Sequence, residues 1–126
     1  RKVLVFDGDG SLLMNLGTLV TIAEAKPRNL VHFVFENGTY EANGSVPIPG
    51  QQRVDFAGFA RSAGIPNVHV FSDLETLKAE IASVLAAPGP TFVVLKIVPG
   101  DPSPVDFKYV HSAEARRIFR EALRSS

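Results

Sequence analysis

The sequence predicts an α/β fold of three layers (α/β/α), in which helices cover both faces of a mainly parallel sheet. Along the 126 residues, apolar segments of strand length alternate with amphipathic segments of helix length, a pattern typical of βαβ units. The strand-like segments are apolar nearly throughout, as expected for strands that are covered on both faces. The predicted strands are Val3–Phe6, Leu30–Phe35, Val68–Phe71 and Phe92–Val98.

Two helices are predicted between the first three strands. The first begins near Ser11 and ends before Pro27, because proline cannot continue a helix, and its apolar character indicates burial. The second runs from about Val54 to Ala63 and ends at Gly64, since glycine readily adopts the left-handed conformation of a C-cap. The residues expected to face the core are Leu12, Leu16, Leu19, Val20 and Ala23 in the first helix and Phe56, Phe59 and Ala60 in the second.

Two further helices are predicted near the C-terminus. One begins with the capping box Ser72-Asp73-Leu74-Glu75 and ends before Pro88, and the other runs from Ala113 to Leu123 with Ser112 as its N-cap. Their apolar positions are Leu74, Leu77, Ile81, Val84 and Leu85, then Ile118, Phe119, Ala122 and Leu123, with Arg116, Arg117, Arg120 and Arg124 on the solvent side of the last helix. Two long segments without periodicity, Asn37 to Arg53 and Pro99 to Ser112, are expected to be loops.

Composition bounds the possible functions. A chain of 126 residues forms one domain, and the absence of cysteine excludes disulfides and a thiol nucleophile. The 13 basic and 13 acidic residues give a net charge of 0, so no electrostatic footprint for nucleic acid or an anionic membrane is present. No apolar run approaches the roughly 20 residues that span a bilayer, and no leader peptide is recognisable, so a cytoplasmic protein is expected.

The segment most informative about chemistry is Phe6-Asp7-Gly8-Asp9-Gly10-Ser11, which follows the first predicted strand and opens the first helix. Glycines allow close approach of the backbone to a ligand, and free amides at a helix start favour an anion. A carboxylate in the same turn is unfavourable beside phosphate unless a cation lies between them. The combination therefore points to a divalent metal, most plausibly Mg²⁺, bridging Asp9 and a phosphate.

A second polar cluster, Glu36-Asn37-Gly38-Thr39-Tyr40, follows the next predicted strand. If the two strands are parallel neighbours, their carboxyl ends lie side by side. Asp9, Asn37 and a backbone carbonyl near Thr39 could then complete one oxygen cage, which suits a hard cation.

These residues resemble a known family. Gly8-Asp9-Gly10, followed after 25 residues by Glu36-Asn37, is similar to the thiamin diphosphate signature, in which Gly-Asp-Gly precedes Asn-Asn at such a spacing. The segments 11–17, 37–40 and 54–60 also resemble the diphosphate-binding domain of thiamin-dependent 2-oxo acid decarboxylases. The sulfopyruvate and phosphonopyruvate decarboxylases are the most similar members, and the likeness covers essentially residues 1–126.

The resemblance implies a thiamin diphosphate-binding fold with Mg²⁺ held by the side chains of Asp9 and Asn37 and by the carbonyl of Thr39. The cofactor-binding residues that it implies are Gly8, Asp9, Gly10, Ser11, Leu12, Asn37, Thr39 and Tyr40. Two departures from the family pattern occur. Glu36 replaces the first Asn of the pair, and the stretch Ala42–Pro47 lacks the expected Thr-Gly-Gly-Gln-like sequence, which leaves the substrate open.

The resemblance also implies what this chain lacks. In such enzymes the glutamate that activates the cofactor comes from a separate pyrimidine-binding domain or subunit. The chain is therefore expected to be a fragment or subunit, inactive alone, within a dimer or larger oligomer that decarboxylates a small 2-oxo acid. The start at Arg1 rather than Met agrees with that expectation.

Three alternatives remain open from the residues. One is a non-catalytic regulatory or assembly domain of a thiamin enzyme, against which the intact Asp9 and Asn37 argue. A thiamin-dependent carboligase of the acetolactate synthase type would share the same motifs. Residues 5–12 also resemble the first motif of haloacid dehalogenase-like phosphatases, in which Asp7 would be the nucleophile and Asp9 the general acid. In that interpretation Lys96 would be the family's lysine, and Asp101 and Asp106 its late acidic motif.

Overall fold

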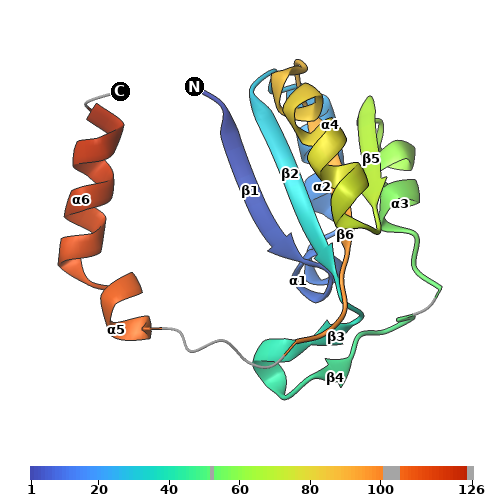
Figure 1. Ribbon diagram of the computed structural model, residues 1–126, viewed down its shortest axis with the longest axis horizontal. Helices are drawn as coiled ribbons and strands as arrows, with labels where there is room; N and C mark the ends of the chain where they lie inside the picture. The colour runs from blue at the N-terminus through green and yellow to red at the C-terminus, as the bar shows by residue number, and fades with distance from the viewer. Residues whose placement is uncertain (52, 101–105, 125–126) are drawn as a thin grey trace.

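The computed structural model of the chain describes residues 1–51, 53–100 and 106–124. Strands and helices follow one another along the chain (Figure 1). In chain order, the elements are β1 (Val3–Gly8), α1 (Asp9–Met14), α2 (Gly17–Ala25), β2 (Leu30–Glu36), β3 (Thr39–Tyr40), the 3-10 helix η1 (Glu41–Asn43), β4 (Val46–Pro47), α3 (Phe56–Ala63), β5 (Asn67–Phe71), α4 (Leu74–Ala86), β6 (Thr91–Lys96), α5 (Phe107–Val110) and α6 (Ala113–Arg124).

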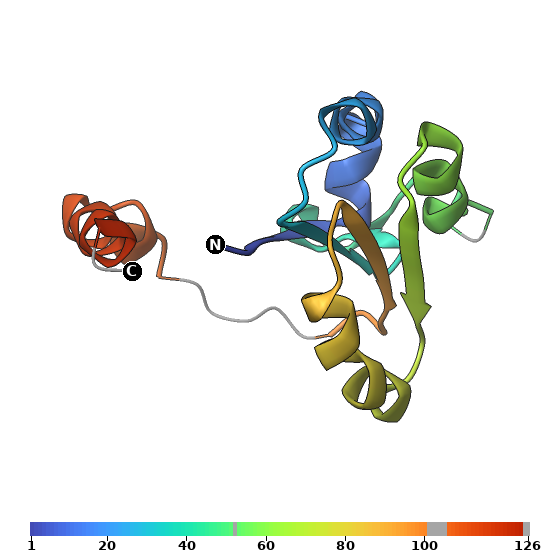
Figure 2. The same ribbon diagram turned by 90° about the horizontal axis from the view of Figure 1, so that it is seen from above.

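The main sheet confirms the predicted α/β architecture. Its four strands are parallel in the order β1-β2-β6-β5, and β3 and β4 form a separate antiparallel pair. Seen from above, α2 and α3 lie on one side of the sheet and α4 on the other (Figure 2). Because the strands are parallel, their carboxyl ends meet at one edge, where α/β proteins bind ligands.

Two apolar clusters fill the layers on either side of the sheet. Successive residues of a strand point to opposite faces, so Val34 joins the cluster under α2 and α3, whereas Val31 and Phe33 join the one under α4. All three are at most 4% exposed. The sheet is therefore covered on both faces at β2 and β6.

The predicted first helix is two helices. α1 begins at Asp9, two residues earlier than expected, and ends at Met14 because Asn15 has the non-helical angles φ −146° and ψ 54°. α2 then ends before Pro27 as predicted, with Lys26 in the left-handed conformation at φ 48°. The break is a correction to the sequence prediction, and it confines α1 to a short turn directly beside the end of β1.

Helix ends elsewhere agree in part with the prediction. Gly64 caps α3 in the left-handed conformation at φ 97°, and Ser112 Oγ accepts the Ala115 amide at 3.0 Å at the start of α6. The N-cap of α4 lies one residue later than the predicted capping box places it. Asp73, not Ser72, is the N-cap of α4, and its carboxylate accepts the Thr76 amide at 2.8 Å.

Some predicted core residues are exposed. Val20, Phe59 and Leu74 are 60%, 39% and 60% exposed, because a helix that packs on one side of a sheet buries only a narrow stripe. β6 ends at Lys96, so Val98, the predicted end of that strand, lies beyond it and is 86% exposed.

Strand β1 also differs from expectation, since it is not covered on both faces. It forms one edge of the sheet and is paired on one side, with β2. Its apolar residues are accordingly exposed, from 38% at Val5 to 63% at Phe6.

Helices α5 and α6 lie apart from the sheet (Figures 1 and 2). α5 falls in the segment predicted to be a linker, and Ile118, Phe119 and Leu123 of α6 are 43%, 64% and 46% exposed. The predicted apolar side of α6 is thus uncovered. The described part of the chain contains no helix with the length and apolar character needed to cross a bilayer.

The predicted loop from Asn37 to Arg53 has structure of its own. Thr39 pairs with Pro47 and Tyr40 with Val46 across the β3–β4 hairpin, and Ile48 is 3% exposed within the core. This hairpin follows β2 directly, so it forms a wall beside the carboxyl edge of the sheet.

Candidate functional site

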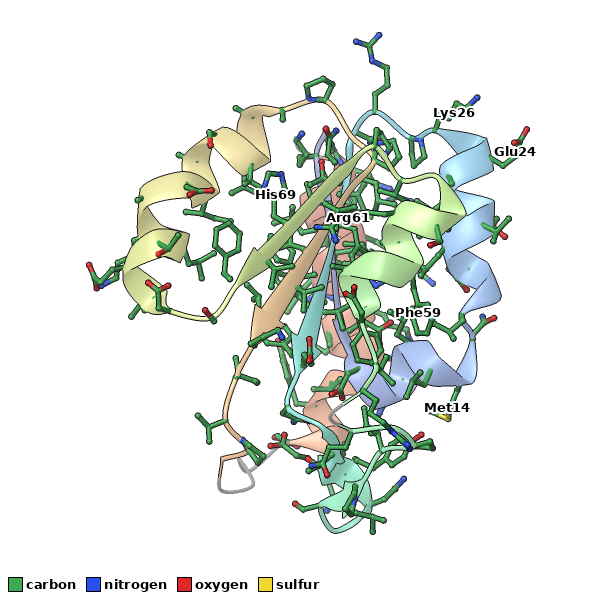
Figure 3. The ribbon with its side chains drawn as sticks, turned by 90° about the vertical axis from the view of Figure 1, so that its right-hand side faces the viewer. Met14, Glu24, Lys26, Phe59, Arg61 and His69 are labelled. Carbon is green, nitrogen blue, oxygen red and sulfur yellow. The ribbon has the colours of Figure 1, made fainter. Side chains whose placement is uncertain are left out.

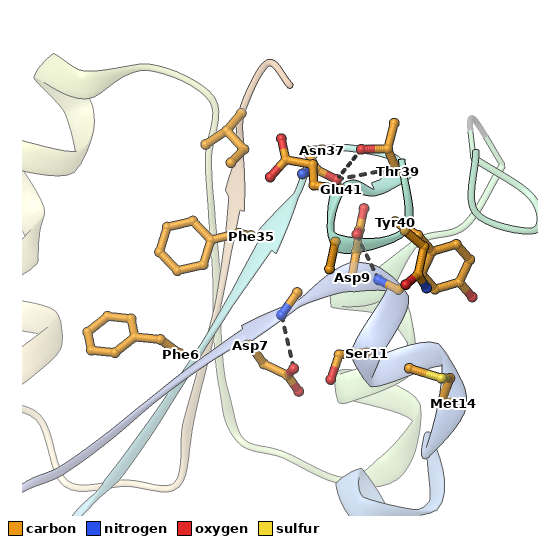
Figure 4. Close-up of a pocket in the computed structure, with 15 residues that line it drawn as sticks. Phe6, Asp7, Asp9, Ser11, Met14, Phe35, Asn37, Thr39, Tyr40 and Glu41 are labelled. Atoms are coloured by element: carbon orange, nitrogen blue, oxygen red, sulfur yellow. Dashed lines mark hydrogen bonds between the residues drawn. The ribbon is translucent and has the colours of Figure 1, made fainter. Parts of the chain in front are cut away.

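A pocket of about 580 Å³ lies at the carboxyl ends of β1 and β2 and is closed on one side by the β3–η1 segment (Figure 4). It contains most of the residues that the two sequence motifs singled out. The lining residues are Phe6, Asp7, Gly8, Asp9, Gly10, Ser11, Met14, Phe35, Asn37, Thr39, Tyr40, Glu41, Ala42, Asn43 and Ile97.

Asp9 is the structural centre of the site. Its side chain is buried, with the residue 1% exposed. Oδ1 accepts the amide of Gly10 at 2.7 Å, and Oδ2 accepts the amide of Gly38 at 2.7 Å. The second bond crosses from the turn after β1 to the loop after β2, so the two motifs lie side by side and are joined by a hydrogen bond.

Asn37 and Thr39 form a tight polar turn opposite Asp9. Oδ1 of Asn37 accepts the Thr39 amide at 2.8 Å and lies 3.3 Å from the Thr39 hydroxyl oxygen. Gly38 between them has φ +75°, a conformation that side chains rarely adopt. The turn thereby directs its backbone toward Asp9 and keeps the amide oxygen of Asn37 beside the pocket.

The donor set fits a hard cation. Asp9 could supply a carboxylate oxygen, Asn37 an amide oxygen and Thr39 a backbone carbonyl, which are ligand types that Mg²⁺ prefers. In the described ranges no group of three or more His, Cys, Asp or Glu residues could hold a metal by itself.

The start of α1 contributes backbone amides rather than a strong helix dipole, since the helix has only six residues. Amides in the first turn have no acceptor within the helix. Ser11 is exposed at this turn and lines the pocket, whereas the Leu12 side chain is 2% exposed in the core and does not line it. A ligand contact by Leu12 could therefore involve only its backbone.

Gly10 and Tyr40 are in close contact across the site. A Cβ built on Gly10 would meet Tyr40 Cε1 and lie 2.5 Å from Tyr40 Cδ1. The aromatic ring therefore packs directly on the backbone of the turn, which only glycine permits at this position.

Sequence reasoning missed the apolar wall of the pocket. Phe6, Phe35 and Ile97 line it, and the rings of Phe6 and Phe35 are 6.1 Å apart. These are apolar residues at or just after the ends of β1, β2 and β6. Their positions at the carboxyl ends of predicted parallel strands were the available signal.

The geometry does not favour the phosphatase alternative. Asp7 and Asp9 point to opposite sides of the turn (Figure 4), and Asp7 Oδ1 accepts the Gly8 amide at 2.9 Å. Lys96 lies 3.8 Å from Glu36 Oε1, and Asp106 caps α5 by accepting the Tyr109 amide. Asp101 lies outside the described residues.

Glu36, the departure from the family signature, ends β2 beside Lys96 and does not line the pocket. Burial raises the pKa of its carboxyl, and Lys96 opposes that shift. Glu36 thus lies beside Lys96 and outside the pocket, whereas Asn37 and Thr39 line the pocket.

Comparison with known proteins identifies the class. Residues 1–95 match the family described as thiamine pyrophosphate enzyme, C-terminal TPP binding domain. The chain belongs to this family, and the fold and the Gly-Asp-Gly turn at the end of β1 are consistent with it.

Individual relatives show which enzymes of this family the chain is similar to. The chain is 39% identical over 125 residues to phosphonopyruvate decarboxylase of Streptomyces hygroscopicus. This match covers 96% of the chain and 30% of that protein. It is 38% identical over 101 residues to sulfopyruvate decarboxylase subunit beta of Methanothermobacter thermautotrophicus, covering 80% of the chain and 51% of that subunit. The chain thus spans about a third to a half of the length of these relatives.

A solved structure agrees with the fold. An enzyme from Mycobacterium smegmatis, assigned as thiamin diphosphate-dependent, superposes with a TM-score of 0.65 at 29% identity. The match covers 79% of this chain and 18% of that one.

Proposed function

We propose that this chain binds the magnesium and diphosphate groups of thiamin diphosphate and forms the diphosphate side of a 2-oxo acid decarboxylase. The observation that carries the proposal is the junction of Asp9 with Gly38, which brings the oxygens of Asp9, Asn37 and Thr39 to one pocket. Membership in the thiamine pyrophosphate family supports the cofactor, and the names of the relatives support the reaction.

Each residue has a defined task in this proposal. Asp9, Asn37 and the Thr39 carbonyl hold Mg²⁺, while the amide and hydroxyl of Ser11 bind diphosphate oxygens. Gly10 holds the Asp9 carboxylate through its amide and lets the ligand approach the backbone. Gly8 and Leu12 contribute backbone only, and Tyr40 packs on the turn. When bound, thiamin diphosphate would supply the electron sink that decarboxylation of a 2-oxo acid requires.

The activating glutamate comes, in this proposal, from a pyrimidine-binding domain or subunit, so the chain alone has no turnover. Two uncovered apolar surfaces support such a partner. One is β1, with Phe6 63% exposed, and the other is α6, with Phe119 64% exposed. Exposed apolar patches of this kind mark protein interfaces. A cytoplasmic location stays a prediction.

Calorimetry of the full chain tests the binding proposal. Thiamin diphosphate should bind with Mg²⁺ and lose measurable binding when Mg²⁺ is removed by a chelator. Asp9→Asn should abolish the Mg²⁺-dependent heat, because the carboxylate charge is lost while the side-chain shape is kept. Glu24→Gln is the matched control, since Glu24 lies exposed on α2 away from the pocket (Figure 3). Unchanged binding by Asp9→Asn contradicts the proposal.

Sedimentation tests the proposed association. The chain should form a dimer or larger species, and Phe119→Glu should shift it toward monomer by placing a charge on the apolar side of α6. Arg120→Gln, on the predicted polar side of the same helix, should leave the distribution unchanged. Equal distributions for the wild type and Phe119→Glu would show that α6 does not mediate self-association.

A further inference from the structure

A histidine interrupts an apolar row that crosses the sheet under α2 and α3. The strand register pairs Val5 with His32, His32 with Phe92 and Phe92 with Val68. His32 is 4% exposed, and its ring meets the ring of Phe92 edge-on at 5.3 Å between centroids. A buried polar ring is costly unless its polar atoms are used, so this position calls for a specific role.

The ring is directed toward the end of β1. Nε2 of His32 lies 3.4 Å from Oδ2 of Asp7, its diagonal neighbour on the adjacent strand. Within the described residues, neither buried ring nitrogen has a hydrogen-bond partner, so the Asp7 contact at 3.4 Å is close without being a formed hydrogen bond. Burial lowers the pKa of His32 and the carboxylate of Asp7 only partly opposes that shift, so the ring is neutral at pH 7 and one nitrogen carries the proton.

Asp7 in turn contacts the metal-binding turn. Its other oxygen, Oδ1, accepts the amide of Gly8 at 2.9 Å, and Gly8 is the N-cap residue of α1. Asp9 is the next residue. A series of contacts therefore links His32 in the core to Asp7, Asp7 to the Gly8 amide, and Gly8 to the backbone of Asp9.

We propose that His32 is a positioning residue for the diphosphate-binding turn, acting through Asp7. The neutral ring donates its Nε2 proton toward Asp7 Oδ2, which orients Oδ1 onto the Gly8 amide and holds the turn in the geometry that presents Asp9. The inference rests on the proposed function, because it assigns His32 to the support of the same magnesium and diphosphate site.

The apo chain provides the first test. Nitrogen NMR should show His32 as the Nε2-protonated tautomer, and Asp7→Asn should change the His32 ring shifts. The Gly8 amide should exchange with solvent faster in His32→Leu, which lacks the donor, than in His32→Gln, whose amide can still donate. An Nδ1-protonated ring, or equal Gly8 exchange in the wild type and both variants, overturns the inference. This arm needs no cofactor, so it decides the role of His32 even if thiamin diphosphate does not bind.

Calorimetry with Mg²⁺ and thiamin diphosphate provides the second test. Loss of a residue that orients a metal ligand typically reduces affinity by about 10-fold or more, and His32→Leu should show a reduction of that size. His32→Gln should recover most of the affinity. Asp7→Asn and the double variant Asp7→Asn/His32→Leu should bind equally, because both residues act in one path. His69→Leu is the matched control, a half-buried histidine on β5 far from the turn (Figure 3).

Outcomes for the two proposals are separable. A wild-type chain that fails to bind thiamin diphosphate contradicts the proposed function. If the wild type binds thiamin diphosphate and His32→Leu binds it with equal affinity, the positioning role of His32 is contradicted and the proposed function is not. Additive losses in the double variant also overturn it, because they would mean that His32 and Asp7 act independently.

Discussion

The carboxylate of Asp9 accepts the amide of Gly38 at 2.7 Å, across 29 residues of sequence. This bond joins the turn after β1 to the loop after β2 at the carboxyl edge of the sheet. Because the Asp9 side chain is buried and both its oxygens are held by amides, the carboxylate has one defined position. The two halves of the thiamin diphosphate signature are thus one structural unit.

Gly38→Ala should weaken both the fold and ligand binding. Gly38 has φ +75°, and a Cβ there would lie 2.7 Å from Gln51 Cγ. The left-handed conformation costs a non-glycine residue about 1–2 kcal/mol, so the free energy of unfolding measured with urea should fall by that amount. Relaxation of the turn should also displace the amide that Asp9 accepts. An unchanged free energy of unfolding would contradict this account of the loop.

Gly10→Ala should be far more harmful than Gly8→Ala, although both glycines belong to one motif. A Cβ on Gly10 would overlap the ring of Tyr40, whereas a Cβ on Gly8 meets nothing within 4 Å. Overpacking of this kind typically costs about 1–3 kcal/mol. Thermal unfolding should show the difference, and Tyr40→Ala should partly rescue Gly10→Ala by removing the ring. Equal stability of the two single variants would argue against the Gly10–Tyr40 contact.

Leu19→Ala should destabilise the fold much more than Val20→Ala, although the two residues are neighbours in α2. Leu19 is 2% exposed and packs in the core, whereas Val20 is 60% exposed. Leu→Ala substitutions in cores cost about 2–5 kcal/mol, and exposed substitutions usually change stability by less than about 0.5 kcal/mol. Urea denaturation of both variants checks this. A large loss for Val20→Ala would mean that this face of α2 is covered by a partner in solution.

Protonation of His32 should destabilise the fold at mildly acidic pH. Burial lowers the pKa of His32 from its usual 6.5, with partial opposition from Asp7. Below about pH 6.5 the unfolded chain takes up the proton and the folded chain does not. The contribution to the free energy of unfolding is therefore complete above that pH and is lost as the pH falls toward the lowered value.

Urea denaturation at a series of pH values between 8 and 5 measures this effect. The slope of stability against pH should be smaller in His32→Gln than in the wild type, because the titrating ring is gone. Identical slopes would show that His32 is not the group responsible.

The local signals were sufficient for most elements. The apolar segments at β1, β2, β5 and β6, the left-handed cap at Gly64 and the cap at Ser112 follow from nearby residues and were confirmed. The break after Met14 was missed because residues 11–23 keep a helical apolar pattern across it. The N-cap at Asp73 rather than Ser72 was missed because both types of side chain can cap a helix.

The residues of the site also divide into those that local sequence predicts and those that depend on tertiary contacts. Asp9, Asn37 and Thr39 were recognisable from residue type and spacing, and the parallel sheet brings their segments together as predicted. Phe6, Phe35 and Ile97 were assigned to strands, and their exposure to the pocket depends on what packs above the strand ends. The link from His32 to Asp7 likewise depends on a diagonal contact between two strands.

The sequence by itself determined the class of fold, the order of its strands and helices along the chain, and the two polar motifs at the ends of β1 and β2, because these depend on hydrophobic periodicity and on residues close together in the chain. Only the tertiary structure decided which apolar residues are covered, and it leaves those of β1 and α6 exposed. It alone also decided how Asp9 contacts Gly38 and how Asp7 contacts His32. Those features arise from contacts between strands far apart in sequence, whose register and packing no local pattern specifies.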